Sequence, residues 1–593
     1  MAGRHVATCT SYYYVFMLMY CDDGLENAIN YLLRLRRIIP TIKLKMDLVN
    51  NGILLSKNSV NNLFGQREPW QVASITASSI LTSYWLWNFL CQDESKCFQT
   101  LSLYNRFKKF TFTQIKKIPK FKKQVEEETK KISDLFENEV IENTKSEKYI
   151  IELPSQGIPR DELIKTVNRY LNLGKYNWKE GFISGAIYYY DEELIKLLTE
   201  VYGYASYTNP LHSDIFPGIC KMEAEVVRLV VNLFHGDSNA CGTMTSGGTE
   251  SIIMACKAYR DYGKNECGIK KGEIIVPRSV HPAFDKAACY FGIKIIHIDL
   301  NPDTYTVNLK KMENAINKNT LLLVGSFPNF PYGTSDDIEA ISALGLKYNI
   351  PVHVDCCLGG FIAAFMPQAG FPLPPFDFIL PGVTSISADT HKYGYAPKGS
   401  SVVLYSDKKY RHNQYYVCTE WPGGHYGSPT ISGSRSGGII AACWATLMYF
   451  GMNGYITSTK EIMDTKIFIE EQLRSMEGIF IFGKPTTSVI AIGSNDFNIY
   501  RLSDALNARG WNLNTLQFPI GIHICITHLH TKPGVASLFI EDLRQELIEI
   551  LKTPNVQLTG KMAMYGMSAT LPDRTIVGDI TRYFIDAMYY TPK

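Results

Sequence analysis

Lys392 lies in a stretch whose residue types suit a reactive amine. From Ser385 to Gly399 the chain runs Ser-Ile-Ser-Ala-Asp-Thr-His-Lys-Tyr-Gly-Tyr-Ala-Pro-Lys-Gly. A lysine attacks a carbonyl carbon only as the neutral amine, which requires a shielded position where the ammonium can lose its proton. The apolar, aromatic and glycine-containing neighbours of Lys392 offer that shielding. A His-Lys pair by itself is more typical of a surface loop, so the assignment depends on other residues.

Two upstream features supply the partners that such an amine needs. Asp355 ends the run Ile-Pro-Val-His-Val-Asp, where a carboxylate at a buried strand end requires a cation or a hydrogen-bond donor. A protonated pyridine nitrogen is such a partner. The second feature, Thr245-Ser-Gly-Gly-Thr-Glu250, precedes a strongly helical run. Its glycines, its hydroxyl and the positive end of the helix form an anion site suited to a phosphate.

The order of these features along the chain matches pyridoxal 5'-phosphate. Its phosphate is expected in the turn that holds Ser246, Gly248 and Thr249. Its ring nitrogen is expected at Asp355, and its aldehyde carbon on Lys392. The sequence therefore predicts pyridoxal 5'-phosphate as the cofactor and no metal site.

From about residue 68 to near the C-terminus, the chain resembles the sphingosine-1-phosphate lyase family. Several separated motifs carry the resemblance. They are Asn209–Gly218 (Asn-Pro-Leu-His-Ser-Asp-Ile-Phe-Pro-Gly), Thr245–Glu250, His353–Phe361, Gly382–Tyr405 and Gly433–Arg435.

The resemblance implies further roles in and around the cofactor site. His281 matches a histidine that stacks over the ring, and His391 matches a ligand of the cofactor phosphate. Ser434 matches a hydroxyl that reaches the partner's cofactor across a dimer interface, and Tyr426 matches an active-site tyrosine. From the residues alone, His281 could instead cap the helix that starts near Pro282.

A second anion site, for the phosphate of the substrate, is also implied. By resemblance it consists of Tyr188, Asn209, His212 and Lys398. Lys398 lies six residues beyond Lys392, across a turn that could bring its ammonium back to the pocket. Without the resemblance, Asn209 and His212 are more typical of loop residues.

The resemblance implies a carbon–carbon (aldehyde) lyase of sphingolipid degradation. Such an enzyme cleaves the C2–C3 bond of sphingosine 1-phosphate and related phosphorylated long-chain bases in retro-aldol fashion, and releases a long-chain aldehyde and phosphoethanolamine. Lys392 and a tyrosine are both candidates for the base that removes the C3 hydroxyl proton. The alternatives are an amino-acid decarboxylase, which needs neither a second phosphate site nor a membrane anchor, and a membrane scaffold that has lost activity.

Composition is that of an ordinary globular protein. Of the 593 residues, 46% are hydrophobic and 20% charged, and the formal charge of +3 gives no case for nucleic-acid binding. The 14 cysteines show no metal-type spacing, so we expect reduced thiols in a protein that faces the cytosol.

A membrane anchor is expected before the catalytic region. The segment from Trp70 to Gln92 has no charged residue, and its length suits a single spanning helix of about 20 residues. Its many Ser and Thr residues leave a buried or interfacial helix as the alternative. The stretch from Arg106 to Lys123 contains many basic residues and no acidic residue, and such a stretch is usually retained on the cytoplasmic side of a membrane. The alternative interpretation is a solvated linker. The family implies a single-pass signal-anchor in the endoplasmic reticulum membrane with a cytosolic catalytic domain.

The alternation of short apolar runs and helical runs predicts an α/β fold with a mostly parallel sheet. Strands are expected at Glu273–Val276, Ile293–Leu300, Thr320–Ser326, Ile350–Asp355 and Ser400–Tyr405. This is the arrangement of the aspartate-aminotransferase-like fold, type I of the pyridoxal-phosphate transferases. The expected divisions are a lumenal segment 1–68, a transmembrane helix 69–92, a basic linker and helix 93–153, the N-terminal part of the catalytic region 154–235, a large cofactor-binding domain 236–435, and a small C-terminal α/β domain 436–593.

Overall fold

The computed structural model describes residues 67–90, 118–558 and 574–592, together with the single residues 65, 111 and 115. Almost all of the expected lumenal segment 1–68, and most of the basic linker before residue 118, lie outside these residues. The chain divides into two units, Met1–Gln92 and Asp93–Lys593. In the first unit the described element is the helix α4 (Pro69–Leu90). The elements below belong to the second unit.

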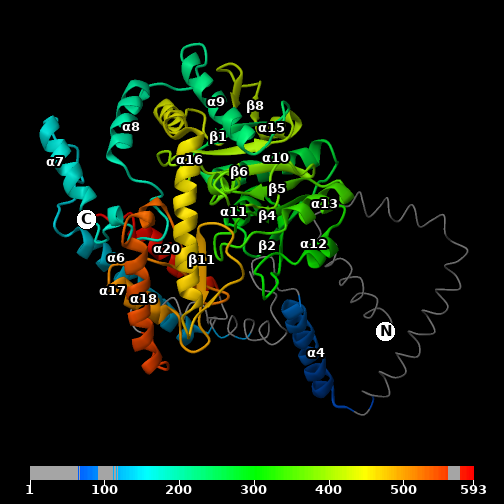
Figure 1. Cartoon of the computed structure of the whole chain (residues 1–593). Coiled ribbons are helices and arrows are strands. Elements are labelled where there is room, and N and C mark those ends of the chain that lie inside the picture. The colour runs from blue at the N-terminus through cyan, green and yellow to red at the C-terminus, as the bar shows by residue number, and fades with distance from the viewer. Residues whose placement is uncertain are drawn as a thin grey trace, which may run out of the picture. The chain divides into compact units, whose positions relative to one another are not determined.

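A seven-stranded sheet forms the centre of the second unit (Figure 1). Its strand order is β1-β7-β6-β5-β4-β2-β3, and β7 is antiparallel to both of its neighbours while the remaining pairs are parallel. Most strands are buried along their whole length, as expected for a parallel sheet covered on both faces. The strands are β1 (Cys241–Thr245), β2 (Glu273–Pro277), β3 (Lys294–Ile298), β4 (Thr320–Ser326), β5 (Val352–Asp355), β6 (Val383–Ala388) and β7 (Ser401–Tyr405).

The carboxyl ends of β1, β5 and β6 lie at one edge of this sheet. In the register, Asp355 pairs with Ser387 near the end of β6, and Thr245 at the end of β1 pairs with Ser401 at the start of β7. The loops that follow these ends carry the three motifs on which the cofactor prediction rests. Ligands of open α/β sheets bind at such an edge.

Helices connect the strands of the large sheet. Among them, α10 packs against β7 and α13 packs against β4, and Figure 1 shows both helices beside the sheet. The connecting helices are α10 (Gly248–Asn265), α11 (Ala283–Phe291), α12 (Leu309–Ala315), α13 (Ile338–Tyr348), α14 (Gly360–Ala363) and α15 (Lys408–Gln414).

A smaller antiparallel sheet with the order β10-β11-β13-β12 follows, as expected for a smaller C-terminal α/β part. Its strands are β10 (Phe480–Ile481), β11 (Val489–Gly493), β12 (Asn514–Leu516) and β13 (Gly521–Cys525), with helices α17 (Tyr500–Ala508) and α18 (Val535–Lys552) and the short 3-10 helix η2 (His528–Thr531).

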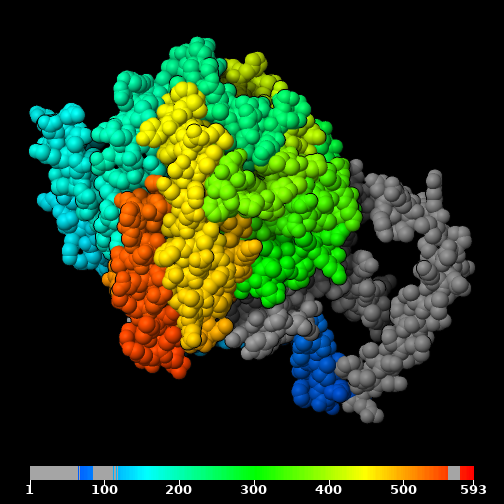
Figure 2. All heavy atoms as spheres, viewed as in Figure 1, coloured from blue at the N-terminus to red at the C-terminus, as the bar shows by residue number. Residues whose placement is uncertain are grey.

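The long helix α16 (Gly437–Arg474) joins the two sheets. On the face shown in Figure 2 it lies at the surface between α18 and the large domain. Gly451 has non-helical backbone angles, φ 53° and ψ −172°, which divide the helix at this residue. The helix packs against α8 (Glu192–Ala205) and α9 (Pro217–Leu233).

The residues before the large sheet form helices, and the last helix returns to them. The C-terminal helix α20 (Arg574–Ala587) packs against α6 (Pro119–Thr144), where the rings of Phe136 and Phe584 meet edge to face at 5.4 Å. The other elements are α7 (Arg160–Leu171), η1 (Trp178–Glu180), α8 (Glu192–Ala205), α9 (Pro217–Leu233) and the two-stranded ribbon of β8 (Tyr416–Cys418) and β9 (Tyr426–Ser428).

Within the described residues, one helix is long and apolar enough to cross a membrane, and it is α16. Because 44% of its apolar window is buried inside the protein and the helix packs on α8 and α9, it is explained as a helix of the protein core. The helix α4 forms where the spanning segment 69–92 is expected, and its spanning role stays a prediction. Every cysteine in the described part of the chain is a free thiol, as expected.

A glycine fixes the junction of the two sheets. Gly333 has φ +70°, and a Cβ atom on it would collide with the backbone carbonyl of Val489 in β11. We predict that Gly333→Ala lowers the free energy of unfolding by about 1–2 kcal/mol for the left-handed backbone, with about 1–3 kcal/mol more for the collision.

The matched control is Gly268→Ala, because Gly268 has φ +68° and open space around it. Thermal unfolding followed by circular dichroism should show a clearly larger loss for Gly333→Ala. Equal losses in the two variants would contradict the close packing at this junction.

Candidate active site

A cavity of about 460 Å³ opens beside Lys392. Lys392, His391 and Lys398 line one part of it, and the aromatic run from Tyr188 to Tyr190 lines another. The remaining wall is largely apolar and comes from α8, with Leu194, Ile195 and Leu198. The cavity therefore combines two lysines with an apolar flank.

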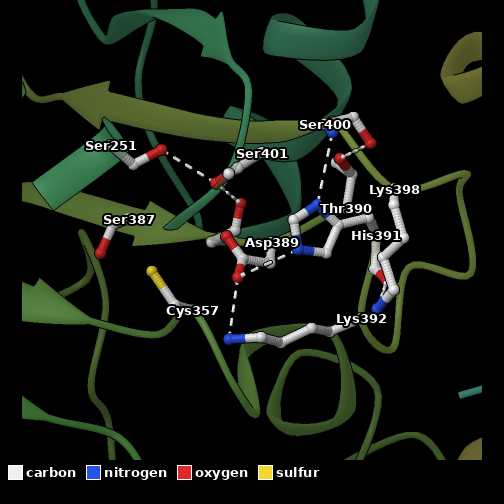
Figure 3. A network of polar contacts seen from close by, with 12 residues as sticks. Ser251, Cys357, Ser387, Asp389, Thr390, His391, Lys392, Lys398, Ser400 and Ser401 are labelled. Carbon is white, nitrogen blue, oxygen red and sulfur yellow. Dashed lines mark hydrogen bonds and ion pairs between the residues drawn. The ribbon is translucent and has the colours of Figure 1, made fainter. Parts of the chain in front are cut away.

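Lys392 is held by a carboxylate three residues before it. Its Nζ atom lies 2.8 Å from Oδ2 of Asp389, and the side chains of Lys392 and Asp389 are 22% and 2% exposed. Figure 3 shows the Lys392 side chain extending toward the Asp389 carboxylate. Burial acts to lower the pKa of Lys392, but the charge of Asp389, with smaller contributions from Cys357 and Tyr188, raises it overall.

The Asp355 carboxylate is held by hydrogen bonds from the loop that follows it and from the neighbouring strand β6. Its Oδ1 atom accepts the backbone N–H of Cys357 at 3.1 Å and the Ser387 hydroxyl at 3.4 Å. The same Ser387 hydroxyl lies 3.0 Å from Nε2 of His353. Burial lowers the pKa of His353 to about 4, so this ring is neutral near pH 7. Among the described residues, nothing bonds to Oδ2 of Asp355, which leaves that oxygen for a ligand.

The predicted phosphate turn starts α10. The first N–H groups of a helix have no acceptor inside the helix, and here no side chain caps them. Glu250 binds the donors of Ser246, just before the helix: its Oε2 atom accepts hydrogen bonds from the N–H and from the hydroxyl of Ser246, at 2.7 and 2.6 Å. Ser246 is thus engaged within the protein, and its predicted contact with the cofactor stays a prediction.

This turn requires a residue without a side chain at position 248, because protein atoms crowd the place of a Cβ atom. An ideal Cβ on Gly248 would lie 2.8 Å from both carboxylate oxygens of Asp389 and 2.8 Å from Sγ of Cys357. On Gly247, by contrast, a Cβ would meet only Cε1 of His391, at 3.3 Å. The absence of a side chain at 248 lets the start of α10 approach the Lys392–Asp389 pair.

Two of the histidines predicted for the site, His281 and His391, lie near Lys392 and Asp389. His281 accepts the backbone N–H of Ala283 through Nδ1 at 3.1 Å, which is the helix-start contact considered as its alternative role. Burial lowers its pKa, and the charges of Asp355, Lys392 and Asp389 also act on it, so its ring lies among them. His391 accepts the N–H of Ser400 at 3.3 Å, and its Nε2 atom lies 3.7 Å from Oδ2 of Asp389. Burial lowers the pKa of His391 as well.

Lys398 returns to the pocket as the turn suggested. Its ammonium donates to the backbone carbonyl of His391 at 3.4 Å and lies 4.9 Å from the ring centre of Tyr188. Burial lowers the pKa of Lys398, and the nearby charge of Lys392 lowers it further. Tyr188 is 9% exposed, and burial raises the pKa of its phenol.

The remaining predicted residues form a second group outside the lining of this cavity. The side-chain amide of Asn209 donates to the Ser434 hydroxyl at 3.0 Å, and its oxygen accepts the N–H of Arg435 at 3.2 Å. Tyr426 lies on β9, with its hydroxyl next to Gly433. His212 is exposed one turn beyond Asn209. The structure thus joins Asn209 to Ser434 but gives neither of them a contact with Lys392.

The residues around Lys392 fit pyridoxal 5'-phosphate. They supply an amine, a strand-end carboxylate with a free oxygen, a histidine ring among the charges, and an uncapped helix start. The space over Gly247 is open except for the ring of His391. These are the groups that the aldehyde, the ring nitrogen, the ring face and the phosphate require.

Sequence analysis missed Asp389 and Glu250. Asp389 directly follows β6 and precedes Lys392 by three residues, but β6 was not expected from the sequence, so no strand end marked this carboxylate. Glu250 lies in the first turn of α10, where an acidic residue favours the start of a helix. Both carboxylates are buried, at 2% and 9% exposure.

Several known proteins are similar to this chain over most of its length. Residues 146–492 match the family model of the pyridoxal-dependent decarboxylase conserved domain. The chain is 58% identical to the sphingosine-1-phosphate lyase of Drosophila melanogaster over 534 aligned residues. The alignment covers 90% of this chain and 97% of that protein. The chain belongs to the sphingosine-1-phosphate lyase family.

Other members of the family and solved structures extend the match. Sphingosine-1-phosphate lyase 1 of Mus musculus is 47% identical over 92% of this chain and 94% of that protein. The structure of the sphingosine-1-phosphate lyase from Burkholderia pseudomallei superposes with a TM-score of 0.67 and 40% identity, over 72% of this chain and 98% of that chain. A glutamate decarboxylase from Lactobacillus brevis, at 20% identity, a TM-score of 0.60 and a coverage of 70% and 98%, shares the fold. The predicted fold class and cofactor are confirmed.

Gly248→Ala tests the geometry of the turn. The added methyl group would collide with the Asp389 carboxylate and with Cys357, so we predict that it displaces the Lys392–Asp389 pair and weakens the binding of pyridoxal phosphate by at least about tenfold, roughly 1.4 kcal/mol. The measurement is an absorbance titration of the apoenzyme with the cofactor.

Gly174→Ala is the control, since a Cβ atom on Gly174 has nothing within 4 Å and this glycine lies outside the lining of the cavity. It should bind the cofactor nearly as the wild type does. Equal affinity in both variants would show that Gly248 does not hold the pair in place.

Proposed function

We propose that this chain cleaves the C2–C3 bond of sphingosine 1-phosphate and related phosphorylated long-chain bases, with release of a long-chain aldehyde and phosphoethanolamine. The observation that carries the proposal is the second lysine of the cavity, Lys398, which lies beside Lys392 against an apolar wall. One cation suits the phosphate of the substrate and the apolar wall suits its hydrocarbon chain. Membership in the sphingosine-1-phosphate lyase family, and the similarity to the two lyases of Drosophila melanogaster and Mus musculus, support this proposal.

Pyridoxal phosphate, when bound, supplies an electron sink that makes the bonds to an amine-bearing carbon labile. Within the protein, Asp355 is proposed to hold the ring nitrogen and to keep a proton on it through its free Oδ2 atom. Lys392 is proposed to hold the cofactor between turnovers, and His281 to lie over the ring. His391 and the start of α10, with Gly248 and Thr249, are proposed to bind the cofactor phosphate.

For the substrate phosphate we propose Lys398 with Tyr188, both at the cavity. Because burial lowers the pKa of Lys398, an incoming phosphate dianion would strengthen the ammonium form by direct charge pairing. Asn209 and His212 are proposed as further ligands of that phosphate, and Tyr426 as a residue of the active site. None of these three lines the cavity of the same chain.

We propose that the second group acts in the site of a partner subunit in a homodimer. What supports this is the contact of Asn209 with Ser434 and the exposed apolar side chains near Asn209 in sequence, such as Tyr204 at 79%, Tyr207 at 97% and Ile215 at 62% exposure. Large exposed apolar patches are typical of interfaces. A second copy would cover this surface and bring Ser434 to the other cofactor.

We further propose the organisation inferred from the sequence for the rest of the chain. The segment 69–92 would span the endoplasmic reticulum membrane once, with 1–68 lumenal and the basic linker of 93–153 on the cytosolic side. The catalytic part would comprise 154–235, the large domain 236–435 and the small domain 436–593. Resistance of the full chain to alkaline extraction from membranes, lost on deletion of 1–92, is the test of the anchor.

The activity is tested by product analysis. Detergent-purified full-length protein loaded with pyridoxal phosphate is incubated with sphingosine 1-phosphate, and the products are identified by mass spectrometry. We expect a long-chain aldehyde and phosphoethanolamine in equal amounts, both lost in Lys392→Ala. Carbon dioxide from an amino acid, with no aldehyde from the phosphorylated base, would instead support an amino-acid decarboxylase.

A mixed dimer tests the shared site. Lys392→Ala removes the amine of one subunit, and Ser434→Asp places a negative charge where the partner's cofactor phosphate is expected. Each variant alone should be inactive or strongly impaired. Co-expressed heterodimers, purified through two different tags, should regain activity in one of their two sites. No recovery in verified heterodimers would mean that each site is built from a single chain.

A further inference from the structure

Asp389 is the buried carboxylate closest to the reactive amine. Oδ2 lies 2.8 Å from Nζ of Lys392 and 3.7 Å from Nε2 of His391. It directly follows β6, so the sheet fixes its backbone, while Lys392 lies in the turn just beyond. Figure 3 shows its carboxylate between the imidazole of His391 and the end of the Lys392 side chain.

The second oxygen of this carboxylate has no partner of its own. Among the described residues, Oδ1 of Asp389 is buried and accepts no hydrogen bond. A Cβ atom on Gly248 would lie 2.8 Å from it, so this oxygen faces the uncapped start of α10. The positive end of a helix attracts an anion. Asp389 thus stands between the Lys392 ammonium and the positive end of α10.

A structural role alone does not account for this arrangement. A carboxylate that only stabilised the fold would have its oxygens satisfied by backbone donors, as Asp336 does with the N–H groups of Val307 and Ser326 at 2.8 and 2.9 Å. The Asp389 carboxylate instead contacts two side chains that reach into the cavity, Lys392 and His391. Its contacts therefore change whenever the state of the Lys392 amine changes.

We propose that Asp389 is the positioning residue of Lys392. Its carboxylate holds the amine in the site and sets the amine's protonation state whenever that amine is not bonded to the cofactor. To become a nucleophile, Lys392 must lose one proton: an N–H bond at Nζ breaks, the electron pair stays on nitrogen, and the proton passes to Asp389 or to water. The inference rests on the proposed function only for the role of Lys392, because it concerns the amine before any substrate is present.

The sign of the effect follows from the charges. Burial lowers the pKa of Lys392 and Asp389 raises it. Removal of the carboxylate leaves the burial effect in place, so the neutral amine should appear at a lower pH. The other titratable groups that face the amine stay the same in both proteins and cancel in the comparison. They are Cys357, Tyr188, His281, His391, Lys398 and Cys525.

The test is the loading of the full-length apoenzyme with pyridoxal phosphate, without substrate. The rate at which the absorbance of lysine-bound cofactor develops is measured against pH for wild type, Asp389→Asn and Asp389→Glu. For Asp389→Asn we expect the midpoint of the pH profile to fall by about 1–3 pH units, together with a lower turnover number. Asp389→Glu, which retains the charge on a longer side chain, should keep the midpoint near that of the wild type.

An unchanged midpoint in Asp389→Asn would overturn the proposal. If that variant does not fold, Asp389→Glu decides, because a midpoint shifted to low pH despite the retained carboxylate contradicts control by its charge. The outcome is separate from that of the proposed function. A shifted midpoint without aldehyde production would keep this inference and reject the lyase, while aldehyde production with an unchanged midpoint would do the reverse.

Discussion

The site depends on one buried ion pair, between the ammonium of Lys392 and the carboxylate of Asp389. Either charge alone would be costly in a pocket where Asp389 is 2% exposed. Together at 2.8 Å they stabilise each other, and the pair can exist because Gly248 has no side chain and lets the start of α10 come close. The pair fixes the position of the one amine that the chemistry needs.

The large sheet explains how residues that are far apart in sequence reach this pair. Asp355 ends β5, Asp389 follows β6, and the turn at Gly248 follows β1, and these ends share one edge. The hydrogen bonds of Ser387, on the neighbouring strand β6, connect Asp355 to the neutral His353 on the same strand β5. The ends of buried strands thus hold each charge with little freedom, which is what a pre-organised site requires.

Much of this could be predicted from the sequence, and the misses have physical reasons. β4 has the bounds predicted for it because its run Thr-Leu-Leu-Leu-Val-Gly-Ser is nearly continuously apolar. β1 and β6 were not predicted, since Thr243, Ser385 and Ser387 interrupt the apolar pattern. These side chains are buried because they find hydrogen-bond partners inside, such as His353 for the two serines. Lys392, Asp355 and Lys398 could be placed from motifs, but Asp389 could not be distinguished from a solvated loop carboxylate without the register of β6.

The central role of Lys392 is tested by mapping the residue to which the cofactor is attached. Full-length holoenzyme is reduced with borohydride, which makes the attachment permanent, and is then digested and analysed by mass spectrometry. We expect a pyridoxyl-phosphate modification on Lys392 alone. Modification of Lys398, the other lysine of the cavity, or of a lysine elsewhere would contradict it.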